Sequence, residues 1–226
     1  LKTSSSILSL YHNSYNNLDK ILAAEGLSAF NGVLLDLGLS SLQLGSKNRG
    51  FSYRSGGPLD MRYDQSSGSG AGKLINQTDQ DSLAQIFKEY GEERLASRIA
   101  KSIKEMTAMN TIADLREAIR RCTPPNHRDR TFARIFQALR IAVNGELDIL
   151  QQFLTKFIDF LHPGGRIVII SYHSLEDRLV KHSFKELASG GILDILTKRP
   201  ITATEKERKN NRRAGSAKLR AAVKVA

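Results

Sequence analysis

The sequence predicts an α/β fold built on a doubly wound sheet, and two apolar runs with the segment between them carry this prediction. The runs GVLLDL at 32–37 and RIVIIS at 166–171 have the composition of strands buried on both faces of a parallel sheet. Helical periodicity extends from about Thr131 to Leu161, and His162-Pro163-Gly164-Gly165 interrupts it before the second run. Strand, long helix, turn and strand in this order are typical of βαβ units.

Shorter patterns on either side complete the predicted sheet domain. The segment 18–25 places Leu18, Ile21 and Leu22 at helical spacing. The last apolar run, 217–225, alternates enough to form a final strand, for which an antiparallel position at the sheet edge is one option. We also expect a strand at Ile7–Tyr11, a helix near 175–188, a strand near 192–197 and a basic loop at 198–213.

A helical insertion is predicted between the two halves of the sheet domain. Residues 38–72 are rich in glycine and serine, and a connection of that length is usually functional or disordered. Helical periodicity resumes at 81–106 and again at 112–122, which ends before Pro124-Pro125 and the basic loop 126–130. The predicted domains are therefore a first core part at 1–57, a helical substrate-recognition insertion at 58–130, and a second core part at 131–226.

Composition narrows the function classes. The 34 Lys and Arg against 23 Asp and Glu give a formal charge of +11, which favours RNA or another polyanion as partner. One cysteine, Cys122, excludes an internal disulfide framework and a cysteine-rich zinc site. No apolar run approaches the roughly 20 residues that span a bilayer, so we expect a soluble protein with no membrane partner. The five histidines are scattered, and we expect no metal site.

Polar residues follow both apolar runs where a doubly wound sheet binds ligands. Asp36 ends the first run, and the small polar residues after it would let the backbone approach a ligand closely. An aspartate that only caps a turn is the alternative. His173 follows the second run and would lie at the same sheet edge. Ser174 and Asp177 next to it have the spacing of a capping box. The alternative is therefore that residues 171–178 only begin a helix.

A loop with interleaved arginines and aromatic residues is a candidate RNA contact. Arg49, Phe51 and Arg54 alternate within 48–54, and guanidinium and ring faces together suit unstacked bases and phosphates. A solvated loop without a partner is the alternative.

Several strings, taken in order along nearly the whole chain, are similar to one family. They are LLDLGLSSLQ at 34–43, RGFS at 49–52, GPLDMR at 57–62, FQALRIAVN at 136–144, GGR at 164–166 followed by SYHSLEDR at 171–178, and SAKLR at 216–220. Together they resemble the signatures of the small-subunit (16S-type) rRNA cytosine-N(4)-methyltransferases of bacteria and organelles. The stretch 126–133 departs from the short basic turn that this family usually has there.

The resemblance implies a Rossmann-like class I methyltransferase sheet with an inserted helical subdomain, and S-adenosylmethionine as cofactor. It implies methylation of the exocyclic amine of a decoding-centre cytidine. By matching, Tyr15, Asp36 and Gln43 would contact the cofactor, and Tyr15 stands where the family usually has phenylalanine. The family's glycine-rich cofactor loop, its first strand and its acidic ribose-binding residue would all precede Leu1, and we expect the native protein to have them.

The chemistry of the reaction suggests the remaining roles. We predict that Asp36, Ser40 or Ser41, and His173 surround the reacting amine. The base would leave its stack to reach them. The expected partner is small-subunit rRNA or an assembling small subunit, in the bacterial cytoplasm or an organelle matrix, with a dimer left open. The residues expected to hold the RNA are Arg49, Phe51, Arg54, Asp60, Arg62, Arg140 and Asn144.

Two rival functions stay open at this point. A non-catalytic ribosome-assembly factor derived from the same family would keep the RNA-binding residues and lose the cofactor loop. A DNA amino-methyltransferase would carry an Asp-Pro-Pro-aromatic string after the strand, where this chain has Leu37-Gly38 instead.

Overall fold

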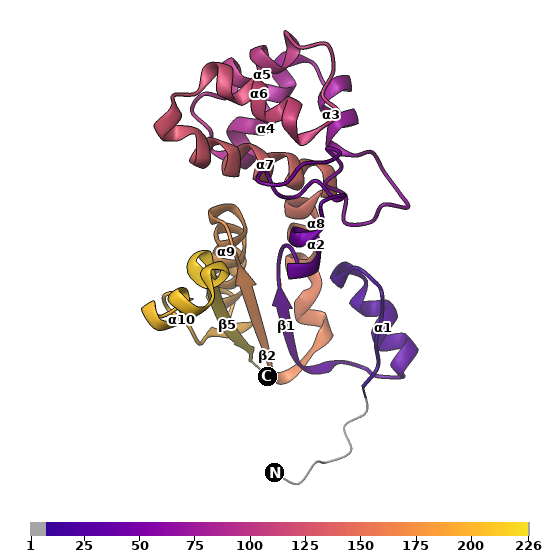
Figure 1. Cartoon of the computed structure of the whole chain (residues 1–226). Helices are drawn as coiled ribbons and strands as arrows, with labels where there is room; N and C mark the ends of the chain where they lie inside the picture. Colours follow the sequence, from indigo (N-terminus) through magenta and orange to yellow (C-terminus); the bar gives the residue numbers. More distant parts are fainter. Residues whose placement is uncertain (1–7, 226) are drawn as a thin grey trace. The chain divides into compact units, whose positions relative to one another are not determined.

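The computed structural model describes residues 8–225, apart from the side chain of Ser41, and it divides into two compact units (Figure 1). The first unit, Leu1–Gly38 with Asp148–Ala226, contains the sheet. The second, Leu39–Leu147, is helical. The predicted insertion at 58–130 lies inside the second unit, which is wider because the loop before it and the helix after it belong to the same core.

The sheet confirms the predicted α/β class. Its strand order is β1 (Phe30–Asp36), β2 (Leu161–Ser171), β5 (Lys218–Lys224) and β3 (Leu193–Ile195), with the two-residue β4 (Ile201–Thr202) also paired to β5. β1 and β2 are parallel, with Gly32 opposite Arg166 and Asp36 opposite Ile170. β5 is antiparallel to β2, as predicted, but it lies between β2 and β3 and not at the sheet edge.

Helices cover one face of this sheet. Helix α8 (Glu146–Lys156) and helix α9 (Ser174–Ser189) contribute Phe153 and Phe184 to the same buried cluster as Ile167 and Ile169 of β2. On the opposite face, Leu34 of β1 is 64% exposed. The prediction that the first run is buried on both faces is therefore wrong for Leu34, because the core helices pack on the other side.

Other short elements complete the sheet unit. The predicted helix at 18–25 is confirmed as α1 (Leu18–Glu25), and the predicted helix near 175–188 as α9. The region predicted as a basic loop contains β4 and α10 (Glu205–Asn210), followed by the 3-10 turn η4 (Arg212–Ser216). Two further 3-10 turns are η1 (Tyr15–Asn17) and η3 (Phe157–Phe160).

Two predicted elements of this unit are wrong. Residues 8–11 form no strand; Leu8 and Leu10 are 79% and 84% exposed and pair with nothing among the described residues, while Ile7 lies outside that part. The sequence His162-Pro163-Gly164-Gly165 is not a turn before the strand. It lies inside β2, where the register with β1 shifts between Phe30 and Gly32, so an irregularity in the ladder accommodates it.

The predicted long helix at 131–161 is also wrong as one element. Helix α7 (Arg128–Asn144) ends at Gly145, whose φ of 61° is left-handed and whose N–H donates to Ile141 O. Glycine adopts this conformation without the steric cost that other residues meet, so it ends the helix although the apolar spacing continues. Helix α8 then begins at Glu146, and the basic loop predicted before Thr131 is partly the start of α7.

The helical unit is made of short helices around one apolar core. They are α2 (Ser41–Gly45), α3 (Ala71–Gln77), α4 (Gln80–Gly91), α5 (Ala96–Lys104), α6 (Ile112–Cys122), the 3-10 turn η2 (Pro125–His127) and α7. The predicted helix at 112–122 is confirmed, and a Thr111–Asp114 capping box begins it. The predicted helix at 81–106 is two helices, because Glu92 adopts a left-handed φ of 48° between them. No described helix is both long and apolar enough to cross a membrane.

Phe87 tests how far the helical core controls stability. Its ring is fully buried in α4, which packs against α7. Phe87→Ala should lower the free energy of unfolding by about 3–5 kcal/mol, because the lost burial is accompanied by a cavity. Urea unfolding followed by circular dichroism measures this. Lys88→Ala, an exposed change in the same helix, should stay within about 0.5 kcal/mol of the parent. Equal effects of the two changes would contradict the assignment of Phe87 to the core.

Candidate functional site

The candidate site lies at the carboxyl edge of the two parallel strands. Asp36 is the last residue of β1 and pairs with Ile170, and the next N–H, that of Leu37, donates to Ile170 O at 3.0 Å. The pairing therefore continues to the end of both strands. It places Asp36 beside Tyr172 and His173, which follow β2. Open α/β sheets bind their ligands at such edges.

Asp36 is exposed, and a tyrosine fixes one of its oxygens. The Tyr172 hydroxyl donates a 2.8 Å hydrogen bond to Asp36 Oδ1. Burial, and after it the hydrogen bond and the charge of Asp36, raise the pKa of Tyr172 to about 12, so the phenol remains a donor at neutral pH. No hydrogen bond among the described residues engages Asp36 Oδ2. Sequence reasoning missed Tyr172, although the residue directly follows a buried strand in the string that contains His173.

His173 begins helix α9. Its Nδ1 accepts from the Glu176 N–H at 3.4 Å, while Glu176 Oε2 accepts from the N–H groups of Tyr172 and His173 at 2.8 and 3.3 Å. The capping box thus uses His173 and Glu176, one residue earlier than the predicted Ser174 and Asp177. His173 Nε2 is buried 3.2 Å from Glu176 Oε1, without the angle of a hydrogen bond. A role of His173 in the reaction stays a prediction.

Tyr15, the predicted aromatic cofactor contact, is half-buried in the sheet unit. Its ring meets Phe153 edge to face, with centroids 5.4 Å apart and planes at 89°. The next residue ties this turn to α8, because Asn16 Nδ2 donates to Gln152 Oε1 and Lys156 Nζ donates to Asn16 O. The position of the Tyr15 ring is therefore fixed by helix α8.

Gln43 and Ser40 form a reciprocal cap on the short helix α2. Gln43 Oε1 accepts from the Ser40 N–H at 3.0 Å, and Ser40 Oγ accepts from the Gln43 N–H at 3.2 Å. The side chain of Ser41 lies outside the described part of the structure. The predicted roles of these three residues toward the cofactor and the amine stay predictions. Ser40 and Gln43 have a structural role, because together they cap helix α2.

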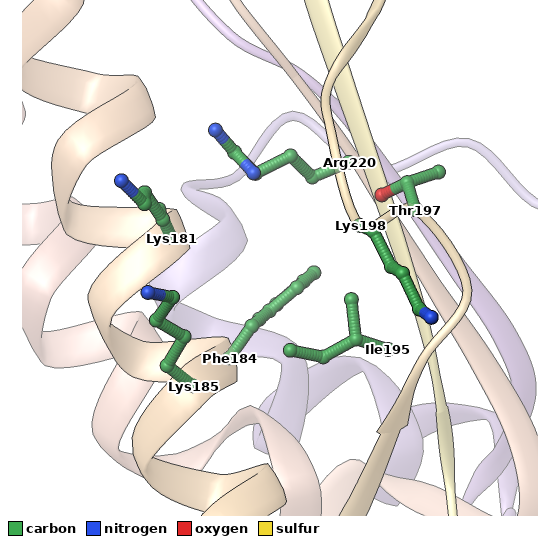
Figure 2. Close-up of a pocket in the computed structure, with 7 residues that line it drawn as sticks. All are labelled: Lys181, Phe184, Lys185, Ile195, Thr197, Lys198 and Arg220. Atoms are coloured by element: carbon green, nitrogen blue, oxygen red, sulfur yellow. The ribbon is translucent and has the colours of Figure 1, made fainter.

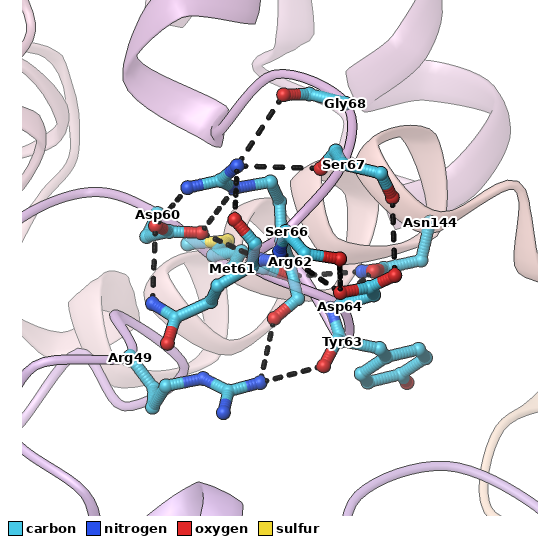
Figure 3. Close-up of polar contacts among 11 residues, drawn as sticks. Arg49, Asp60, Met61, Arg62, Tyr63, Asp64, Ser66, Ser67, Gly68 and Asn144 are labelled. Carbon is cyan, nitrogen blue, oxygen red and sulfur yellow. Dashed lines mark hydrogen bonds and ion pairs between the residues drawn. The ribbon is translucent and has the colours of Figure 1, made fainter. Parts of the chain in front are cut away.

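In the helical unit, four of the predicted RNA-binding residues, Arg49, Asp60, Arg62 and Asn144, lie at one loop, 60–68 (Figure 3). Arg62 and Asp60 form a two-pronged pair, with Nε to Oδ1 and Nη2 to Oδ2 both at 2.9 Å. Arg62 Nη1 also donates to the carbonyls of Gln65, Ser67 and Gly68. The Arg62 side chain lowers the pKa of Asp60 more than burial raises it. Arg62 thus links the beginning of the loop to its end through hydrogen bonds.

Two further predicted residues hold the beginning of this loop. Arg49 Nη2 donates to the carbonyls of Arg62 and Tyr63 at 2.8 Å each. Asn144 donates from Nδ2 to Met61 O at 2.8 Å and accepts the Tyr63 N–H on Oδ1 at 2.7 Å (Figure 3). Both side chains recognise backbone, so they shape the loop from opposite sides.

The other three predicted RNA contacts differ in exposure. Phe51 is only 6% exposed and lies on Tyr63, with ring centroids 5.7 Å apart. Arg140 makes a two-pronged ion pair with Glu146, at 2.8 and 3.0 Å. Arg54 is exposed, and its guanidinium lies 5.5 Å from the centre of the Tyr53 ring. Among the arginines of this set, Arg54 is the exposed one, so its guanidinium is open to a partner.

Sequence reasoning missed the backbone at the centre of this loop. Met61 is fully buried with a left-handed φ of 63°. Gly50 faces it with a φ of 74°, and a Cβ on Gly50 would lie 2.7 Å from Pro58 O and 2.8 Å from Asp60 N. The glycine in RGFS was the available signal, since close approach of two backbone segments requires a residue without a side chain.

Comparison with known proteins supports the resemblance. Residues 1–225 match the MraW methylase family. The chain is 51% identical over 203 residues to a Trichormus variabilis protein named ribosomal RNA small subunit methyltransferase H, covering 88% of this chain and 66% of the relative. A Kosmotoga olearia protein of the same name is 47% identical over 221 residues, covering 96% and 74%. The chain thus spans slightly less than two thirds of the length of the Trichormus relative.

The Asp60–Arg62 pair predicts a pH-dependent stability. The pKa of Asp60 is lowered below its ordinary 3.8 in the folded state. The ionised carboxylate therefore contributes fully to the free energy of unfolding above pH 3.8, and this contribution is lost as the pH falls through the folded-state pKa. Asp60→Asn should therefore be less stable than the parent at neutral pH, and this difference should shrink in acid. Urea unfolding at several pH values measures it, with Asp129→Asn, an exposed acid of the same unit, as control. A difference that does not vary with pH would contradict the pairing.

The Tyr172–Asp36 contact predicts a shift in a phenol pKa. Asp36→Ala removes the acceptor and its charge, so the pKa of Tyr172 should fall from about 12 toward its ordinary 10.0 without reaching it, because burial remains. Carbon-13 labelling of tyrosine with NMR detection reports the pKa, and Tyr172→Phe identifies the signal. Asp19→Asn, an exposed change in α1, should leave the signal unmoved. An unchanged pKa in Asp36→Ala would show that the two side chains are not in contact.

Proposed function

Since this chain belongs to the MraW methylase family, we propose that it methylates the exocyclic amine of a cytidine in small-subunit rRNA, using S-adenosylmethionine. The observation that carries the proposal is the exposed Asp36 carboxylate, held by Tyr172 at the carboxyl edge of the parallel strand pair. The names of the relatives support the substrate class, since they describe small-subunit ribosomal RNA methyltransferases. The charge of +11 supports a polyanionic substrate.

The residues of the sheet unit fit part of a cofactor site. The Tyr15 ring is half-buried and fixed on Phe153, which suits an apolar contact with the adenine. The Asp36 carboxylate lies at the strand ends and is open to a ligand. The bound cofactor would supply an electrophilic methyl group. The glycine-rich loop and the acidic ribose-binding residue expected before Leu1 are not among the described residues.

Asp36 addresses the chemical difficulty of the reaction. The cytosine amine is a poor nucleophile because its lone pair is delocalised into the ring. A carboxylate oxygen that accepts a hydrogen bond from this amine draws electron density back to nitrogen and orients it for attack. Tyr172 would act as a positioning residue, because its bond to Oδ1 fixes the carboxylate while Oδ2 accepts from the amine. After methyl transfer the nitrogen would lose its extra proton to water, which reaches the exposed strand edge at Asp36.

The helical unit is proposed to recognise the RNA. Its exposed Arg54, lying over Tyr53, suits a phosphate or an unstacked base. Arg49, Arg62 and Asn144 would contribute by holding the shape of the 60–68 loop, because their side chains donate to its backbone carbonyls. The predicted insertion would therefore recognise the substrate through the shape of the 60–68 loop, and not through a separate RNA contact from each arginine.

Asp36→Ala tests the proposed reaction. In the polypeptide as its gene encodes it, the change should abolish transfer of labelled methyl from S-adenosylmethionine to small-subunit rRNA, because the amine loses its acceptor. Circular dichroism should be unchanged, since Asp36 is exposed. Tyr172→Phe should keep measurable but reduced transfer, with the loss in kcat. Full transfer by Asp36→Ala would refute its role.

A cofactor titration separates the enzyme from its non-catalytic rival. Calorimetric binding of S-adenosylmethionine by the same polypeptide supports the methyltransferase. Retained rRNA binding without any cofactor binding would instead support an assembly factor that kept the RNA-binding unit.

A further inference from the structure

A basic pocket in the sheet unit lies outside the candidate site. It is a cavity of about 300 Å³, at the small end of ligand-sized sites. Its lining residues come from α9, from the segment after β3 and from β5: Lys181, Phe184, Lys185, Ile195, Thr197, Lys198 and Arg220. Four of the seven are cations, and none is an acid.

The walls of this pocket are well defined (Figure 2). Lys181 and Lys185, one turn apart on α9, extend from one wall, and Lys198 runs along the opposite wall. Thr197 fixes that opposite wall, because its Oγ1 accepts the Ala221 N–H of β5 at 2.9 Å. Phe184, 2% exposed, and Ile195 supply an apolar floor.

The charge of the pocket is not neutralised from within. Asp177 pairs with Arg220 through both carboxylate oxygens, at 2.7 and 3.2 Å, and also lies 3.4 Å from Lys218 Nζ. Arg220 is thus compensated. For the side chains of Lys181, Lys185 and Lys198, all exposed residues, no ion pair or hydrogen bond occurs in the described part of the chain. The lysine side chains on both walls of the pocket therefore have no counter-charge among the described residues (Figure 2).

The same basic character continues along the chain. Residues 198–213 contain seven Lys and Arg against two Glu. Within them, Arg208, Lys209 and Arg212 line a second, shallower hollow together with Glu205. A strand of regularly spaced phosphates matches an extended run of cations better than a single small anion does.

We propose that this pocket binds one nucleotide unit of the RNA strand, at a contact separate from the reacting cytidine. Lys181 and Lys185 hold the phosphate on one side of this unit, Lys198 on the opposite wall holds the phosphate on the other side, and the floor of Phe184 and Ile195 meets the sugar or base. Lysine suits this task because its compact charge needs no fixed geometry, so the contact is independent of base sequence. The proposal rests on RNA being the substrate of the proposed function.

The test compares two triple variants in binding to a fluorescein-labelled single-stranded RNA. Lys181, Lys185 and Lys198 are changed to glutamine in one. In its matched control, Lys20, Lys73 and Lys88, three exposed lysines elsewhere, are changed to glutamine. Fluorescence anisotropy over a range of salt concentrations gives the affinity and its salt dependence. Each lost phosphate contact on a single strand lowers the slope of log affinity against log salt by about 0.7. Loss of the contacts to the two phosphates that flank the bound unit should thus lower the slope of the pocket variant by about 1.4, and the slope of the control should fall clearly less.

Each result decides between the two proposals. If the parent and the control variant bind the RNA with equal affinity and the pocket variant binds it more weakly, the result supports the pocket as an RNA contact. Equal losses in both variants would overturn it, as would displacement of the RNA by poly-L-glutamate at equal charge concentration, because the site would then recognise any polyanion. A parent that binds no RNA would refute the proposed function itself, whereas a parent that binds RNA while the pocket variant is unaffected refutes the pocket alone.

Discussion

The parallel pairing of β1 with β2 is the constraint on which the candidate site depends. Because Asp36 is opposite Ile170 and the ladder continues through Leu37 N–H, the residues after both strands leave the sheet side by side. A shift of this register by one residue would turn Asp36 to the core face and Leu35 to solvent. The apolar cluster that packs on α8 and α9 fixes the register of β1 against β2, because Leu35, Ile167 and Ile169 are buried in it. The hydrophobic core therefore specifies the position of a polar group that does not belong to it.

The arginines of this chain have two different uses. Arg62 and Arg49 in the helical unit satisfy several carbonyls each, and Arg140 forms a two-pronged pair with Glu146. Such planar groups organise irregular backbone that has no ladder of its own. In the part of the chain that the structure describes, Lys181, Lys185 and Lys198 of the basic pocket have no comparable partners. Net charge alone could not separate these uses, although both contribute to the total of +11.

Sequence reasoning predicted the elements that follow from periodicity. The strands around Leu35 and Ile169 and the helices at 18–25 and 112–122 were confirmed, and the family assignment was confirmed as well. It failed where one residue's backbone conformation decided the outcome. Gly145 and Glu92 end helices whose apolar spacing continues, and nothing in a spacing pattern reports a left-handed φ.

The candidate site was predicted less completely, for a related reason. Asp36 and His173 were placed at one edge by the strand pattern, but the hydrogen bond from Tyr172 and the cap formed by His173 depend on side-chain orientation. A motif names the residues that recur; it does not say which of them hold backbone and which face a ligand. Asn144 illustrates this, since its matched string gave no sign that its amide clamps Met61 and Tyr63.

Met61 limits how this chain can vary. A buried side chain in a left-handed conformation carries a torsional cost of about 1–3 kcal/mol, which the surrounding contacts must offset. Glycine at this position would relieve the torsion but leave a void in the core. Asparagine would accept the backbone angle but bury an amide among apolar groups. A β-branched residue would fill the space and worsen the torsion. Each replacement gains one property by losing another, so sequence drift at position 61 requires compensating changes around it.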